Sequence, residues 1–208
     1  MKLSSNSFAD GQKIPGEFAF AIPDAAHHVR LGKNRNPHFA WSDVPVGVKS
    51  FAMICCDPDV PSKGDDVNQE NRSVPASLPR VAFFHWVLVD LPAGLREINV
   101  GEFSNEVTPR GKPGPTAPHG ARRGINDYTV LFDNDNDMRG DYFGYDGPMP
   151  PWNDELVHHY IFTLYALDIE RLPLEGRFNG PAVLATIQGH ILAQASLTGT
   201  YTLNPNLL

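Results

Sequence analysis

The run VAFFHWVLVDL, residues 81–91, decides the fold class. It is rich in β-branched and aromatic residues and is closed by Pro92-Ala93-Gly94, so it predicts a buried strand. Similar runs lie on either side of it, SFAMICC at residues 50–56 and HYIFTLYAL at residues 159–167. We interpret both as buried strands, the first ending at Asp57-Pro58 because proline cannot donate to a β-ladder.

Weaker patterns complete the predicted fold. Short strands are predicted at residues 18–20, 38–41, 128–132 and 200–203. Pro181 is typical of a first helical turn, and apolar residues then recur at steps of three and four, namely Leu184, Ile187, Ile191 and Ala195, with Gly199 beyond the end. We therefore expect a mainly β sandwich with a C-terminal helix, in one domain over residues 1–208.

Composition narrows the class of protein. The chain has 17 basic and 24 acidic residues, a net charge of −7, which disfavours a nucleic-acid partner. The only cysteines, Cys55 and Cys56, are adjacent in a predicted strand, so they should face opposite sides and not pair with each other. This favours a reducing, cytoplasmic location. We expect no signal peptide in the polar N-terminus and no membrane span, since the apolar runs are too short.

Two long connections interrupt the strands. A polar insertion covers residues about 63–80, and a Gly/Pro-rich loop covers residues about 107–124. The second loop carries four basic side chains and no acid: Arg110, Lys112, Arg122 and Arg123. Connections this long are often functional. A solvated surface loop and a basic rim for an anionic ligand both fit this composition.

No familiar catalytic motif is present. The chain lacks G-x-S-x-G, H-E-x-x-H, a phosphate P-loop and G-x-G-x-x-G, so we predict no catalytic residue and no cofactor. The acidic run at residues 133–137 resembles the start of an EF-hand loop. However, Met138 and Gly144 stand where calcium binding needs Gly and Glu, so we interpret it as an acidic turn.

Three polar residues stand in apolar surroundings. His85 lies mid-strand, His158 precedes a strand, and Asp57 ends one. If they converge, the aspartate can orient an imidazole and favour its cationic form. Two imidazoles with N–H donors would then form a small anion site.

Several stretches resemble the phosphatidylethanolamine-binding protein family, also called Raf kinase inhibitor-like proteins. DPDVPS at residues 57–62 resembles its first signature and YDGPMPP at residues 145–151 its second. The following run, residues 158–168, resembles the bacterial branch. The resemblance implies an antiparallel β-sandwich with a C-terminal helix, few other short helices and a small cleft for phosphate or phosphoryl head groups.

The resemblance also implies a set of ligand-binding residues. Asp57 would be an orienting acceptor, with His85 and His158 as donors to the anion. The remaining members would line the mouth or shape its wall: Tyr160, Pro151, Gly147 and Pro148. The sequence departs from the family at His159, where an arginine is usual, and in a longer stretch at residues 152–157. Both long connections also look longer than in compact bacterial members.

Three functions remain open at this point. The first is a binding protein for a phosphate-type anion that regulates a kinase or protease partner. The second is a metal-dependent hydrolase or other enzyme in which Asp57, His85 and His158 hold iron or zinc. The third is a regulator that acts through the basic loop from Arg110 to Arg123. A homodimer is compatible with each of them.

Overall fold

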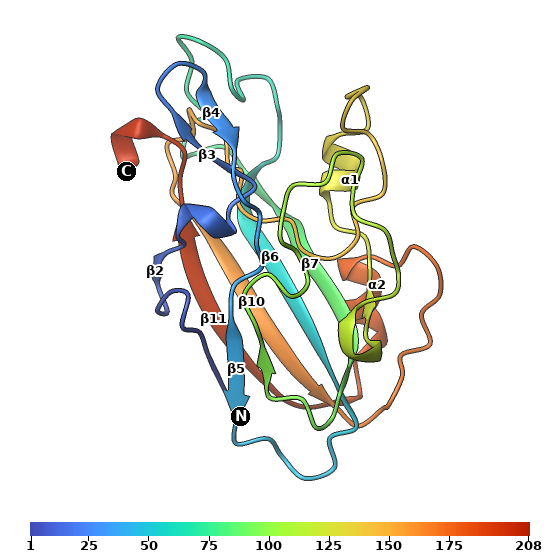
Figure 1. Ribbon diagram of the computed structural model, residues 1–208. Helices are drawn as coiled ribbons and strands as arrows, with labels where there is room; N and C mark the ends of the chain where they lie inside the picture. Colours follow the sequence, from blue (N-terminus) through green and yellow to red (C-terminus); the bar gives the residue numbers. More distant parts are fainter.

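The three strongest predicted strands lie side by side in the centre of a large sheet. The computed structural model describes residues 1–208 and contains a six-stranded sheet in the order β2-β11-β10-β6-β7-β9 (Figure 1). Strands β10, β6 and β7 are antiparallel neighbours, with Cys55 opposite both Phe162 and Trp86. A second sheet has the order β1-β5-β8, and β3 and β4 form a separate hairpin.

The boundaries of the elements are as follows. The strands are β1 (Lys2–Ser4), β2 (Gln12–Lys13), β3 (Ala21–Asp24), β4 (His28–Leu31), β5 (Phe39–Ser42), β6 (Ser50–Pro61), β7 (Arg80–Pro92), β8 (Glu97–Ile98), β9 (Arg122–Arg123), β10 (His158–Leu167) and β11 (Ile191–Tyr201). The helices are α1 (Tyr128–Leu131) and α2 (Gly180–Thr186), with single 3-10 turns at Gly16–Phe18, Pro118–Gly120 and Pro205–Leu207. None of the helices is long and apolar enough to cross a membrane.

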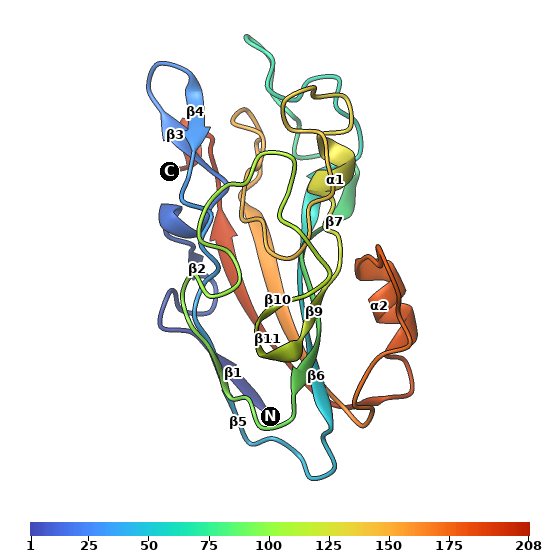
Figure 2. The same cartoon turned by 45° about the vertical axis from the view of Figure 1, so that its right-hand side comes forward.

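The central sheet is buried on both faces, which explains its continuous apolar strands. Figure 2 shows the small sheet on one side of it and α2 on the other. Trp86 and Phe162 belong to the core between the two sheets, and Val87 and Val183 belong to the core under α2. As predicted, Cys55 is in the first core and Cys56 packs against the second, and both thiols are free. The mainly β prediction is thus confirmed.

Three strand predictions were wrong, one in where the strand ends and two in that no strand forms. Strand β6 does not stop at Asp57-Pro58 but continues to Pro61, because a register shift between Asp57 and Val60 absorbs the proline. Residues 128–131 form helix α1, whose first N–H, on Tyr128, is capped by the Asn126 side chain instead of joining a ladder. Residues 18–20 form no strand, since Phe18 ends a 3-10 turn and the Phe20 N–H donates to the Pro148 carbonyl.

The helix after Asn179 is shorter than its apolar spacing suggested. The Asn179 side chain accepts the Ala182 N–H, which confirms the predicted start, but α2 ends at Thr186. Gly189 then takes a left-handed conformation, with φ +85, that stops the helix. Ile191 and Ala195 belong instead to β11. The pairing of this strand with the whole of β10 outweighs the local helical spacing of its apolar residues.

Two cations of the basic loop are internal, which corrects the idea of a basic rim. Arg122 is buried, with Nε 2.5 Å from Asp90 Oδ2, and it also donates to the carbonyls of Leu172 and Leu174. Lys112 is buried too, with Nζ 2.5 Å from Asp146 Oδ1. Half of the positive charge in this loop therefore stabilises the fold and faces no outside partner.

Candidate functional site

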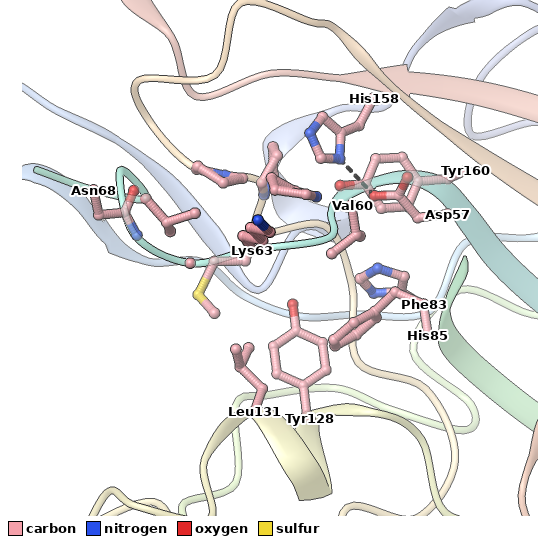
Figure 3. Close-up of a pocket in the computed structure, with 16 residues that line it drawn as sticks. Asp57, Val60, Lys63, Asn68, Phe83, His85, Tyr128, Leu131, His158 and Tyr160 are labelled. Atoms are coloured by element: carbon pink, nitrogen blue, oxygen red, sulfur yellow. Dashed lines mark hydrogen bonds and ion pairs between the residues drawn. The ribbon is translucent and has the colours of Figure 1, made fainter. Parts of the chain in front are cut away.

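A cavity of about 230 Å³ opens where β6, β7 and β10 meet the loops at one end of the sheet (Figure 3). Five sequence-predicted residues line it: Asp57, His85, Pro151, His158 and Tyr160. His158 and Tyr160 are two residues apart on β10, so they share a face of the sheet. The remaining wall comes from the polar insertion (Lys63, Gly64, Val67 and Asn68), from α1 (Tyr128 and Leu131), and from Val60, Pro61, Phe83, Met149 and Pro150.

Gly147 and Pro148 lie behind this lining and do not border the cavity. The Gly147 carbonyl accepts the Tyr128 hydroxyl proton at 2.7 Å, which fixes a wall residue. A side chain at Gly147 would place its Cβ 2.0 Å from the Phe18 carbonyl oxygen, so only glycine fits there. The two residues thus act on the shape of the cavity through their neighbours.

A buried chain of charges runs across the back of the cavity. His158 Nδ1 lies 2.7 Å from Asp57 Oδ2, and His158 Nε2 lies 3.1 Å from Asp154 Oδ2. Arg80 donates two hydrogen bonds to Asp154, at 2.6 and 3.0 Å. Burial opposes the charged imidazole, but the bonds to Asp154 and Asp57 outweigh it and raise the pKa of His158 to about 9. His158 is therefore an imidazolium at neutral pH.

This geometry changes the expected role of His158. Both of its N–H groups donate to carboxylates, so neither is left for a ligand anion. Its position instead fixes Asp57, whose other oxygen accepts the Asp59 N–H at 2.7 Å. Two carboxylates and two cations alternate along the chain Asp57–His158–Asp154–Arg80, so the group is neutral as a whole. The histidine that Asp57 contacts is therefore His158.

His85 presents the opposite situation. Its Nδ1 lies 2.9 Å from the Asp146 carbonyl oxygen, which can only accept, so Nδ1 carries the proton and Nε2 is free. Burial lowers the pKa of His85 below its ordinary value, although Asp57 and Asp146 act against this effect. The neutral ring therefore offers a lone pair at Nε2, and proton uptake converts Nε2 into a donor.

Tyr160 carries an unpartnered hydroxyl group. The residue is 1% exposed and lines the cavity, and its hydroxyl has no well-formed hydrogen bond within the protein, although the Asp57 carboxylate lies near it. Burial raises the pKa of Tyr160 well above its ordinary value, so the hydroxyl stays protonated and can donate. Unpaired buried donors are costly, and a bound acceptor would satisfy them.

We predict that Tyr160→Phe weakens binding of the phosphate-type anion expected from the sequence roughly three- to tenfold, and that it does not lower stability, because it removes a buried hydroxyl without a well-formed hydrogen bond. Tyr145→Phe is the matched control, since the Tyr145 hydroxyl donates to the Phe18 carbonyl at 2.6 Å outside the cavity. The control should lose about 1–2 kcal/mol of unfolding free energy and keep its affinity. Urea unfolding and calorimetry measure both quantities; a Tyr160→Phe protein as destabilised as the control would contradict the prediction.

The sequence reasoning missed several residues of the site. Asp154 lies four residues before His158, and that spacing was the available signal for it. Two of the departures from the family, the stretch at residues 152–157 and the polar insertion, contact each other: the Asn153 side chain donates to the carbonyls of Asp66, Gln69 and Arg72. The insertion is thereby held as a wall of the cavity, and it brings Lys63 to the lining.

The residues of the cavity do not form a metal centre. No group of three or more His, Cys, Asp or Glu side chains is arranged to hold a metal ion. A neutral histidine nitrogen with a free lone pair is needed for coordination, and both nitrogens of His158 face carboxylates instead. The donor set proposed for iron or zinc is therefore not assembled.

The fold and the site define a mainly β protein of packed sheets with a small cavity at one end of the central sheet. The phosphatidylethanolamine-binding protein family profile matches residues 4–202. The chain is 33% identical to the UPF0098 protein YbhB of Escherichia coli, over 97% of this chain and 100% of that protein. It is 32% identical to a UPF0098 protein of Methanothermobacter thermautotrophicus, over 97% and 98%.

A solved structure agrees with this assignment. The crystal structure of Escherichia coli YbcL, described as a member of the mammalian PEBP family, superimposes with a TM-score of 0.68 at 25% identity and covers 97% of both chains. The chain belongs to the phosphatidylethanolamine-binding protein family.

Proposed function

We propose that the protein binds a small phosphoryl anion, either inorganic phosphate or a phosphoryl head group, in the cavity beside Asp57 and His85. The observation that carries the proposal is the buried Tyr160 hydroxyl, which borders the cavity and has no well-formed hydrogen bond even to the nearby Asp57 carboxylate. Lys63, from the polar insertion, also lines the cavity and adds a positive charge to it. A phosphoryl group has enough acceptor oxygens to satisfy these donors together.

The ligand binds together with a proton. Asp57 contributes a carboxylate to the cavity, which disfavours a phosphate dianion next to it. A singly protonated phosphoryl group avoids this repulsion, because its P–OH donates to the Nε2 lone pair of neutral His85. Alternatively, His85 takes up the proton and donates to the dianion. Both routes add one proton to the complex, so they give the same pH dependence.

We predict that phosphate affinity rises as pH falls from 8 to 5.5. The pKa of free His85 lies below about 6.5, and the second pKa of a phosphoryl group is about 6, so proton uptake becomes easier over this range. Calorimetric titration with inorganic phosphate and with phosphoethanolamine measures the affinity. An affinity that rises with pH would contradict the coupled proton, and no detectable binding of either compound at pH 5.5 would reject the proposed function.

Other features of the function stay predictions. Regulation of a kinase or protease would use the rigid Pro150-Pro151 edge of the cavity, where the backbone is pre-ordered for a peptide. Binding without catalysis predicts that the metal-free protein and the protein supplied with zinc or iron hydrolyse no phosphate ester. Cytoplasmic location and dimerisation are decided by cell fractionation and by sedimentation, respectively.

A further inference from the structure

Lys112, a buried cation of the basic loop, pairs with Asp146, the residue that accepts the Nδ1 proton of His85. Lys112 is 7% exposed, and its Nζ lies 2.5 Å from Asp146 Oδ1. The Asp146 carboxylate is fully buried and accepts two further hydrogen bonds, from the side-chain amides of Asn34 at 2.7 Å and Asn126 at 2.8 Å. Three segments distant in sequence therefore meet at this carboxylate.

Asp146 also holds the histidine through its backbone. Its carbonyl accepts the Nδ1 proton of His85 at 2.9 Å, and its N–H donates to the His85 carbonyl at 2.9 Å. The residue that fixes the His85 ring thus carries a carboxylate on its own side chain. We propose that Lys112 is a positioning residue for the cavity: through Asp146, it holds His85 with Nε2 toward the ligand and cancels the carboxylate charge behind the ring.

The charges that face His85 support this role. On the cavity side, Asp57 from β6 is paired with the imidazolium of His158 from β10. Behind the ring, Asp146 is paired with Lys112, and Arg123 from β9 is a further cation near Asp146. The phenols of Tyr128 and Tyr160, which contact the ring edge-to-face, stay neutral because burial raises their pKa values. Removal of Lys112 takes away the ion-pair partner of Asp146, so that only Arg123, which makes no direct ion pair with it, offsets the carboxylate behind the ring.

The proposal has a direct test by imidazole NMR, which reports both the ring tautomer and the titration midpoint of His85. In Lys112→Met, we expect the midpoint to rise by about one pH unit, since an opposite charge nearby favours imidazolium. In Lys112→Met/Asp146→Asn, both charges are gone, and the midpoint should return to the wild-type value. In Asp146→Asn alone, the unpaired Lys112 should lower it.

A matched control separates charge from general destabilisation. Arg122→Met/Asp90→Asn removes another buried ion pair next to β7, and Asp90 has φ +60, which asparagine tolerates. This control should leave the His85 tautomer and midpoint unchanged. A Lys112→Met midpoint that moves no more than the control would overturn the proposal. If Lys112→Met does not fold, equal midpoints in Asp146→Asn and the Lys112→Met/Asp146→Asn protein would overturn it.

The inference rests on the proposed function only where it connects Lys112 to phosphate binding. The His85 midpoint is measured without phosphate, so a wild-type protein that binds no phosphate would reject the proposed function and leave the role of Lys112 decided by NMR. Where phosphate binds, the pH profile of its affinity should shift upward in Lys112→Met together with the His85 midpoint. A profile that stays in place while the midpoint moves would show that Lys112 does not act on binding.

Discussion

A His158→Ala variant is expected to lose about 3–5 kcal/mol of unfolding free energy at pH 7, because it leaves two buried carboxylates without the cation between them. Asp57 and Asp154 are each no more than 1% exposed, so water cannot replace the imidazolium easily. Arg80 continues to neutralise Asp154, whereas Asp57 loses its only cationic partner. Urea unfolding at constant pH measures the loss.

The neighbouring residue provides the control. His159 is exposed, and its Nδ1 lies 2.8 Å from Asp59 Oδ2 at the surface, so His159→Ala should cost less than about 1 kcal/mol. Similar losses in the two variants would show that the buried charge chain contributes little.

The pH dependence of stability gives a second readout for the same charge chain. The folded pKa of His158, about 9, lies above its unfolded value, so its contribution is complete below about 6.5 and is lost as pH rises through 9. For Asp154, burial raises the pKa, but the bonds from His158 and Arg80 outweigh it and lower the pKa overall. Its contribution is therefore present above about 3.9 and fades in more acidic solution. The stability gap between wild type and His158→Ala should narrow between pH 7 and pH 10.

Strand composition was sufficient to predict the centre of the fold. Residues 81–91, 50–56 and 159–167 are apolar on both sides because the sheet is covered by a second sheet and by α2. The same reasoning failed where apolar residues at helical spacing run on into a strand. Ile187, Ile191 and Ala195 fit a helical face, but Gly189 and the long pairing with β10 place the last two in β11.

The candidate site could be predicted as a set of residues but not as a set of interactions. Isolated polar residues in apolar strands indicated Asp57, His85 and His158, since such side chains need partners when buried. Which partners they find depends on loops that are distant in sequence. Asp154 takes the second nitrogen of His158, and Asp146 takes the Nδ1 proton of His85. We expected both histidines to donate to the anion, but these contacts engage both nitrogens of His158 and leave only His85 with a free nitrogen.

Loop charges were the least predictable feature. Lys112 and Arg122 occur in a segment with the composition of a solvent-exposed basic loop, yet both are buried against carboxylates. Their partners, Asp146 and Asp90, belong to a different loop and to β7, so no local pattern indicates the pairing. A buried cation in a Gly/Pro-rich loop becomes visible only when the whole chain is folded.

A His85→Ala variant is expected to lose phosphate affinity about ten- to hundredfold, because a hydrogen bond to a charged group contributes about 1.5–3 kcal/mol. The change should cost about 1–3 kcal/mol of unfolding free energy, because the Asp146 carbonyl loses its donor, but the adjoining cavity can admit water in place of the ring and the fold should persist. The loss should be largest at pH 5.5, where proton uptake by His85 or its ligand contributes most in wild type. Calorimetric titration with phosphate measures the affinity, and circular dichroism checks the fold.

Two further proteins make this last prediction specific. His159→Ala removes an imidazole on the same strand as His158 that does not line the cavity, and it should bind phosphate like wild type. His85→Gln keeps a polar group at the position, but its amide cannot take up a proton. This variant should bind phosphate weakly, and residue 85 should make no contribution to the pH dependence of the affinity. If wild type and His85→Ala bind phosphate equally at every pH, the anion does not contact His85.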